Sequence, residues 1–109
     1  MPDESLKTDH LFDLKNRVVV VTGSTGILGS AYCRALAENG ARVVLTDMAE
    51  RNSAAVAMEL ANSFGVETMG VACDVGVEAD VVRLFASALD RFGRVDAVLN
   101  NAAATGEHL

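Results

Sequence analysis

The sequence predicts an α/β protein built on a doubly wound parallel sheet. Apolar β-branched runs alternate with segments whose apolar residues recur at helical spacing, and short glycine-containing connections separate them. Half of the 109 residues are apolar but only 5% are aromatic, a mixture that suits helices packed on a sheet buried on both faces. The expected element order is β-α-β-α-β-α-β within one domain.

The first half of the chain supplies two strands and two helices. Residues 17–22 (RVVVVT) predict a strand buried on both faces, and residues 42–46 predict another. Residues 26–39 predict a helix that stops at Gly40, because apolar residues recur at helical spacing at Ile27, Ala31, Ala35 and Leu36. Residues 50–64 predict a second helix before Gly65, with one apolar face made of Ala54, Ala57, Met58 and Ala61.

The second half continues the alternation. Residues 67–72 predict a weaker strand interrupted by Gly70, and residues 96–100 predict a fourth strand. Between them, residues 77–92 predict the clearest helix, with a stripe of Val81, Leu84, Phe85, Ala88, Leu89 and Phe92. Because crossovers between parallel strands are right-handed, the expected sheet order is 3-2-1-4, a truncated Rossmann-type fold.

Composition narrows the classes of partner. The net charge of −6 disfavours nucleic acid, although helix dipoles can still bind one small anion. Residues 1–10 are polar and read as a disordered lead-in without a signal peptide, and no apolar run reaches the ~20 residues of a membrane span. We therefore expect a cytoplasmic protein that binds no membrane. Cys33 and Cys73 lack metal-ligand spacing and are expected to be reduced, buried thiols, with no metal site.

A glycine-rich turn, TGSTGILG, joins the first strand to the first helix. Gly23 allows a tight turn, Gly26 lets the backbone approach a diphosphate, and Gly29 lets the helix pack closely. The helix start offers unpaired N–H groups to phosphates, and the two hydroxyls of the turn can add hydrogen bonds. A tight turn without a ligand is the alternative. The predicted phosphate-binding residues are Gly23, Ser24, Thr25, Gly26, Ile27 and Leu28.

An acid ends the second strand. Asp47 follows Gly29 by a little under ~20 residues, the spacing at which a carboxylate meets the adenosine ribose of a dinucleotide. Met48 and Ala49 come next, so no cation is at hand for a 2′-phosphate. These residues favour NAD(H) over NADP(H), and Met48 is included in the predicted site. A solvent-exposed helix cap is the alternative role for Asp47.

With these features in order, the sequence resembles the short-chain dehydrogenase/reductase family from Leu11 to Ala103. Cys73-Asp74-Val75 and Asn100-Asn101-Ala102-Ala103 match its elements after the third and fourth strands. The resemblance implies that Asp74 bonds the adenine amino group, Val75 flanks the ring, and Asn100, Asn101 and Ala102 lie near the cofactor ribose and brace the sheet. Residues 11–109 would then be an incomplete NAD(P)-binding domain. Helix entry for Asp74 and turn formation for the asparagines are the alternatives.

The resemblance also implies a reaction, hydride transfer between an alcohol or sugar hydroxyl and its ketone. The family's Ser and Tyr-x-x-x-Lys are absent, since the single tyrosine, Tyr32, has Leu36 four residues later. The isolated chain is therefore expected to be an inactive, cofactor-binding part of an NAD-dependent enzyme, with no catalytic residue of its own. A non-catalytic dinucleotide-binding fragment is one alternative. A nucleotide-sugar epimerase or dehydratase is another, because Gly26 stands where those proteins have their middle glycine.

The fourth strand has a further consequence. In a complete fold it would be interior, whereas here it would form an open apolar edge. We therefore expect the chain to self-associate or to form a homo-oligomer.

Overall fold

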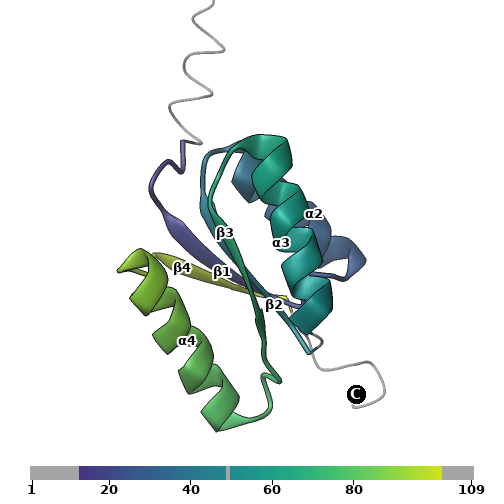
Figure 1. The fold of residues 1–109 in the computed structure, drawn as a ribbon, viewed down its shortest axis with the longest axis vertical. Helices are drawn as coiled ribbons and strands as arrows, with labels where there is room; N and C mark the ends of the chain where they lie inside the picture. Colours follow the sequence, from purple (N-terminus) through teal and green to yellow (C-terminus); the bar gives the residue numbers. More distant parts are fainter. Residues whose placement is uncertain (1–12, 49, 102–109) are drawn as a thin grey trace, which may run out of the picture.

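The computed structural model describes residues 13–48 and 50–101 (Figure 1). The predicted lead-in, residues 1–10, and the predicted site residue Ala102 lie outside these ranges. All the predicted elements are present, and each predicted boundary differs from the observed one by at most one residue. In chain order they are β1 (Val18–Thr22), α2 (Ile27–Glu38), β2 (Arg42–Asp47), α3 (Glu50–Phe64), β3 (Thr68–Ala72), α4 (Glu78–Phe92) and β4 (Ala97–Asn100).

The strands form one parallel sheet in the order β3-β2-β1-β4, which confirms the predicted topology. Helices α2 and α3 cover one face and α4 covers the other (Figure 1). In register, Thr22 lies opposite both Thr46 and Asn100, and Asp47 lies opposite Ala72. The carboxyl ends of all the strands therefore meet at one edge of the sheet.

Two apolar layers sandwich the sheet because successive strand residues point to opposite faces. The α2/α3 layer contains Val19, Val21, Cys33, Ala37, Ala41, Val43, Leu45, Ala57 and Leu60. The α4 layer contains Val18, Val20, Val44, Cys73, Leu84 and Ala88. Both thiols are free and buried, as predicted, and burial raises the pKa of the Cys33 thiol to about 12.

The buried stripe of α2 differs from the predicted one. Gly29, Cys33 and Ala37 face the sheet, whereas Ile27 at the helix start is 92% exposed. Ala31 and Ala35 are exposed as well. Small residues are selected here because α2 lies very close to the chain beneath it: a Cβ on Gly29 would lie 2.0 Å from the carbonyl oxygen of Gly23. Hydrophobicity alone does not mark such positions.

Helix α3 shows the same effect. Its buried residues include Ser53, Ala57 and Leu60, while the predicted core residue Met58 is 66% exposed. Gly70 does not interrupt β3 but lies under α3, where an added Cβ would come within 2.6 Å of the Ala54 nitrogen. Within the predicted α4 stripe, Leu84 and Ala88 are buried, and Leu89 is the one exposed member, at 49%.

At the amino edge of the sheet, Asp96 joins β4 to β1. Its backbone N–H donates to the Val18 carbonyl, and its carboxylate accepts the Val18 N–H, both at 2.8 Å. Arg94 donates to the same carboxylate at 2.6 Å, and Arg17 lies 3.6 Å away. The Arg94 side chain and the Val18 amide hold the pKa of Asp96 below its ordinary value.

The close approach of α3 to β3 predicts a steric effect of Gly70→Ala. The added methyl group would collide with α3 backbone, and the variant should lose roughly 1–3 kcal/mol of unfolding free energy in urea titrations. Gly65→Ala is the matched control, because that site has open space around it and a φ of +68°. Its cost should be about 1 kcal/mol, from backbone conformation alone. Equal losses in the two variants would contradict the steric account.

The Asp96 contacts predict a pH-dependent contribution to stability. Because the folded-state pKa lies below the ordinary value of 3.8, ionised Asp96 stabilises the fold above about pH 3.8, and this contribution disappears as pH falls through the folded-state pKa. The melting temperature of Asp96→Asn should therefore fall furthest below wild type at neutral pH, with the gap closing in acid. Asp90→Asn, on the exposed side of α4, controls for loss of one charge. A gap that is constant with pH would refute this.

Candidate functional site

The predicted site residues within the described ranges all follow the carboxyl ends of strands. Spatially they run in the sheet order: Asp74 and Val75 after β3, Asp47 and Met48 at the end of β2, the glycine turn after β1, and Asn100 and Asn101 at the end of β4. From β1 the chain adds β2 and then β3 on one side, with α2 and α3 on one face of the sheet. It then returns through α4, on the other face, to add β4 on the other side of β1. The direction in which strands are added therefore reverses between β1 and β4. Ligands of open parallel sheets bind at such a switch point, outside the carboxyl ends.

The glycine turn is held by its own backbone and by β2. Gly23 has a φ of +64°, which favours glycine, and its carbonyl accepts the Gly26 N–H at 3.3 Å. Ser24 is fully buried, and both its N–H and its hydroxyl donate to the Thr46 carbonyl at 3.1 Å. The Thr25 hydroxyl donates to Asp47. Both hydroxyls that were expected to bond a ligand thus already donate within the protein.

The start of α2 fits an anionic group. Gly26 is the N-cap and has no side-chain cap, and the first turn carries no acidic residue. The amides of a first helical turn lack intrahelical partners and carry a partial positive charge. A Cβ on Gly26 would meet only the Gly23 carbonyl oxygen, at 3.6 Å, so the turn is open on its outer side. These amides, rather than the turn hydroxyls, are the donors suited to a diphosphate.

Asp47 is tied to the glycine turn. One carboxylate oxygen accepts both the N–H of Thr25, at 3.1 Å, and its hydroxyl, while the other accepts the Met48 N–H at 2.8 Å. Partial burial would raise the pKa of Asp47, but the hydrogen bonds from the Thr25 side chain and the two amides outweigh it and lower the pKa. Asp47 is therefore an anion at neutral pH. Nothing in the sequence indicated that Thr25 would donate two hydrogen bonds to Asp47.

Asp74, in the loop after β3, also makes several hydrogen bonds within the protein. The Asp74 carboxylate accepts the Gly76 N–H at 2.9 Å, and its carbonyl accepts the Val77 N–H at 2.9 Å. The Asp74 N–H donates to Asp80 at 3.0 Å, a contact that sequence reasoning missed. Val75 is 43% exposed beside it, so an apolar side chain and a carboxylate are presented together.

The asparagine pair links β4 to β1. The Thr22 hydroxyl donates to the Asn100 side-chain oxygen at 2.9 Å, and the Asn101 amide nitrogen donates to the Gly23 carbonyl at 3.3 Å. Both side chains therefore contact the strand end and turn that the predicted site is built on. These two hydrogen bonds tie the end of β4 to the end of β1 and to the turn that follows it.

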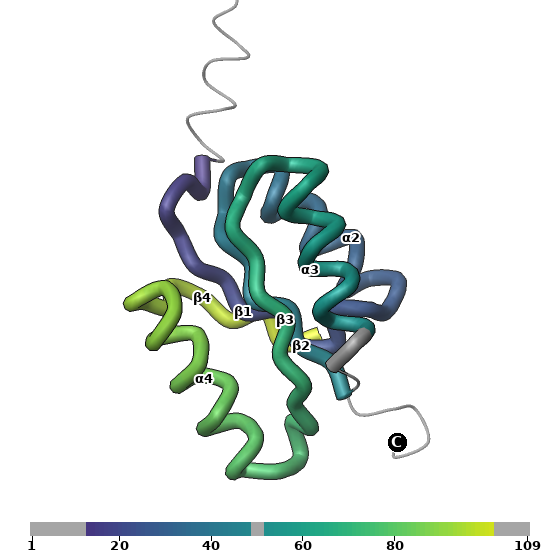
Figure 2. Tube along the Cα trace, viewed as in Figure 1, coloured from purple at the N-terminus to yellow at the C-terminus, as the bar shows by residue number. Residues whose placement is uncertain are grey.

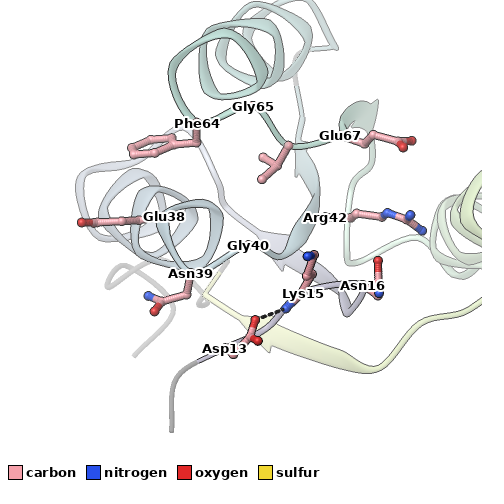
Figure 3. Close-up of a pocket in the computed structure, with 11 residues that line it drawn as sticks. Asp13, Lys15, Asn16, Glu38, Asn39, Gly40, Arg42, Phe64, Gly65 and Glu67 are labelled. Atoms are coloured by element: carbon pink, nitrogen blue, oxygen red, sulfur yellow. Dashed lines mark hydrogen bonds between the residues drawn. The ribbon is translucent and has the colours of Figure 1, made fainter. Parts of the chain in front are cut away.

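A cavity lined by described residues lies elsewhere. It has a volume of about 790 Å³ and is found at the amino ends of the strands, opposite the glycine turn (Figure 3). Its walls mix cations and anions, with Phe64 at one side and Lys15, Glu38, Arg42 and Glu67 around it. We place the candidate site at the carboxyl edge instead, because amide donors and the ionised Asp47 converge there.

Within residues 13–48 and 50–101, no three His, Cys, Asp or Glu side chains gather in a way that would hold a metal ion. None of the helices described has both the length and the apolar character needed to cross a bilayer.

The chain is a Rossmann-type α/β protein, because a glycine turn opens a helix, an acid ends β2 and the parallel sheet has the order 3-2-1-4. A sequence model of the short chain dehydrogenase family matches residues 17–109. The chain belongs to that family.

Known members of the family resemble this chain over most of its length. The L-fucose dehydrogenase of Oryctolagus cuniculus is 41% identical over 86 residues, which are 79% of this chain and 28% of the relative. The crystal structure of an NADPH-dependent 3-quinuclidinone reductase from Rhodotorula rubra matches with a TM-score of 0.78 at 31% identity, covering 83% of this chain and 34% of that one.

An NAD+-bound xylitol dehydrogenase structure matches with a TM-score of 0.73 at 30% identity, over 78% of this chain and 32% of that one. The chain thus spans about a third of the length of these relatives. Solved relatives include proteins with either nicotinamide dinucleotide, so family membership alone does not choose between NAD and NADP.

The contact between Thr25 and Asp47 predicts a change in acidity. Thr25→Val keeps the shape of the side chain but removes the hydroxyl donor, so the pKa of Asp47 should rise toward its ordinary value of 3.8. Carboxyl ¹³C chemical shifts followed through a pH titration would measure it. Ser30→Ala is the control, since that hydroxyl donates to the Ser24 carbonyl and not to Asp47. An unchanged Asp47 titration in Thr25→Val would exclude the hydrogen bond.

Proposed function

We propose that residues 11–109 form the cofactor-binding part of an NAD(H)-dependent oxidoreductase of the short-chain dehydrogenase type. The observation that carries the proposal is the ionised Asp47 carboxylate, held beside the open start of α2 by both donors of Thr25. A dinucleotide needs a diphosphate site and a ribose site a few ångströms apart, and this pair of features offers both.

The amides of Ile27 and Leu28 at the start of α2 would hold the diphosphate. Gly23 and Gly26 would keep side-chain bulk away from it, and Ser24 would fix the turn from beneath. Asp74 and Val75 would meet the adenine. Asn100, Asn101 and Ala102 would lie near the cofactor ribose. Bound nicotinamide would supply the hydride acceptor or donor, and the residues of this chain would hold and orient it.

NAD is favoured over NADP by charge. Hydrogen bonds keep Asp47 ionised, and one lone pair on its Met48-bonded oxygen is left to accept a ribose hydroxyl. A 2′-phosphate in the same place would bring two anions into contact in a half-buried site. Met48 follows directly and offers no compensating positive charge.

The substrate proposal is hydride transfer between an alcohol or sugar hydroxyl and its ketone. It is supported by the L-fucose and xylitol dehydrogenases among the similar proteins. The 109 residues contain one tyrosine, Tyr32, without a lysine four residues later. We therefore propose that these residues bind the cofactor but do not by themselves transfer protons. A nucleotide-sugar epimerase or dehydratase is the second candidate, favoured by the glycine at position 26 instead of 27.

Reversing the charge at position 47 tests the cofactor proposal. Asp47→Arg should weaken NAD binding about tenfold or more, because a hydrogen bond to a charged group is lost, and should narrow or reverse the preference over NADP. Isothermal titration calorimetry with both dinucleotides measures this.

Glu38→Arg carries the same charge change on the exposed far end of α2 and should leave the ratio of the two affinities unchanged. If Asp47→Arg binds NAD as tightly as wild type, the ribose site is elsewhere. If Glu38→Arg shifts the ratio equally, net charge rather than Asp47 decides the preference.

A further inference from the structure

The loop between β3 and α4 is held by a side chain that the proposed function does not use. Figure 2 shows β3 continuing into α4 through a connection at the bottom of the view. Asp80, in the first turn of α4, turns its carboxylate back to this connection and accepts the Asp74 N–H at 3.0 Å. An acid at this helical position commonly bonds the N-cap amide. Here the N-cap is Val77, whose N–H goes to the Asp74 carbonyl instead.

Asp80 is itself held in place. Arg83, one turn further along α4, donates to the other Asp80 oxygen at 3.2 Å and to the Ala72 carbonyl at 3.3 Å. One arginine thus joins the acid to the end of β3. The Asp74 amide and Arg83 also lower the pKa of Asp80, so its carboxylate is charged at neutral pH.

These contacts fix Asp74 at several atoms. Its N–H is bound by Asp80, its carbonyl by the Val77 amide, and one carboxylate oxygen by the Gly76 amide. Within the described ranges, no hydrogen bond is made to the second carboxylate oxygen, Oδ2. The carboxylate is therefore tied to the loop through one oxygen and keeps the other available as an acceptor.

We infer that Asp80 and Arg83 are positioning residues that hold the Asp74 carboxylate for recognition of the purine 6-amino group. The inference rests on the proposed function, in which Asp74 faces the adenine. A rigid carboxylate accepts a hydrogen bond from an amino group and repels the oxygen that hypoxanthine carries at the same place. A carboxylate free to rotate would discriminate less, because it could turn away from that oxygen.

The test compares NAD with nicotinamide hypoxanthine dinucleotide by calorimetry on the full chain. Wild type should prefer NAD about tenfold, the worth of one hydrogen bond to a charged group. Asp80→Ala should bring this preference close to onefold. Asp80→Asn keeps an acceptor for the Asp74 amide and should retain most of it. Arg83→Met provides a second disruption if Asp80→Ala does not fold, and should reduce the preference in the same direction.

Two further variants separate the possible explanations. Glu78→Ala removes the other acid in the first turn of α4 and should lower stability without changing the base preference. Asp74→Ala tests the proposed function, and should abolish the preference. If Asp74→Ala abolishes it but Asp80→Ala and Arg83→Met leave it intact, the positioning role is overturned and the proposed function stands. If Asp74→Ala leaves it intact, or wild type shows none, the adenine assignment fails and the inference fails with it.

Discussion

The carbonyl oxygen of Gly23 is the point on which the carboxyl edge depends. It accepts the Gly26 amide within the turn and the Asn101 side chain from beyond β4, both at 3.3 Å. Any side chain at position 29 would reach within 2.0 Å of it. One backbone atom therefore limits how closely α2 approaches the turn and also anchors the segment that follows β4. The open helix start that a diphosphate would use is a consequence of this packing.

The fold was largely predictable because its determinants are local. Strands such as Val18–Thr22 are continuous β-branched runs, and glycines such as Gly40 and Gly65 end helices with positive φ. The buried faces of α2 and α3 were predicted only in part: Ala57 is buried and Leu36 packs against the core, but the other inner positions were missed. Their inner positions hold Cys33, Ala37 and Ser53, chosen for size by the distance to the sheet, while larger residues such as Met58 point to solvent. The hydrophobicity of a residue carries no information about the distance between helix and sheet.

The grouping of the candidate site residues at one edge of the sheet was predictable for a different reason. Parallel strands bring their carboxyl ends together, so residues after each strand must lie near one another whatever their spacing in sequence. The partners of these residues were not predictable. Thr25 meets Asp47 across 22 positions, and Asp80 meets Asp74 only because α4 begins in a particular orientation. Such contacts depend on side-chain directions that exist only after the chain has folded.

Each of the two apolar layers contains one buried cysteine. Cys33 belongs to the layer under α2 and α3, and Cys73 to the layer under α4. A protonated, enclosed thiol does not react with an alkylating reagent until the surrounding packing opens. Labelling rates followed separately at each cysteine therefore report how often each side of the sheet is exposed to solvent. The chain carries its own pair of reporters for local unfolding, without any engineered probe.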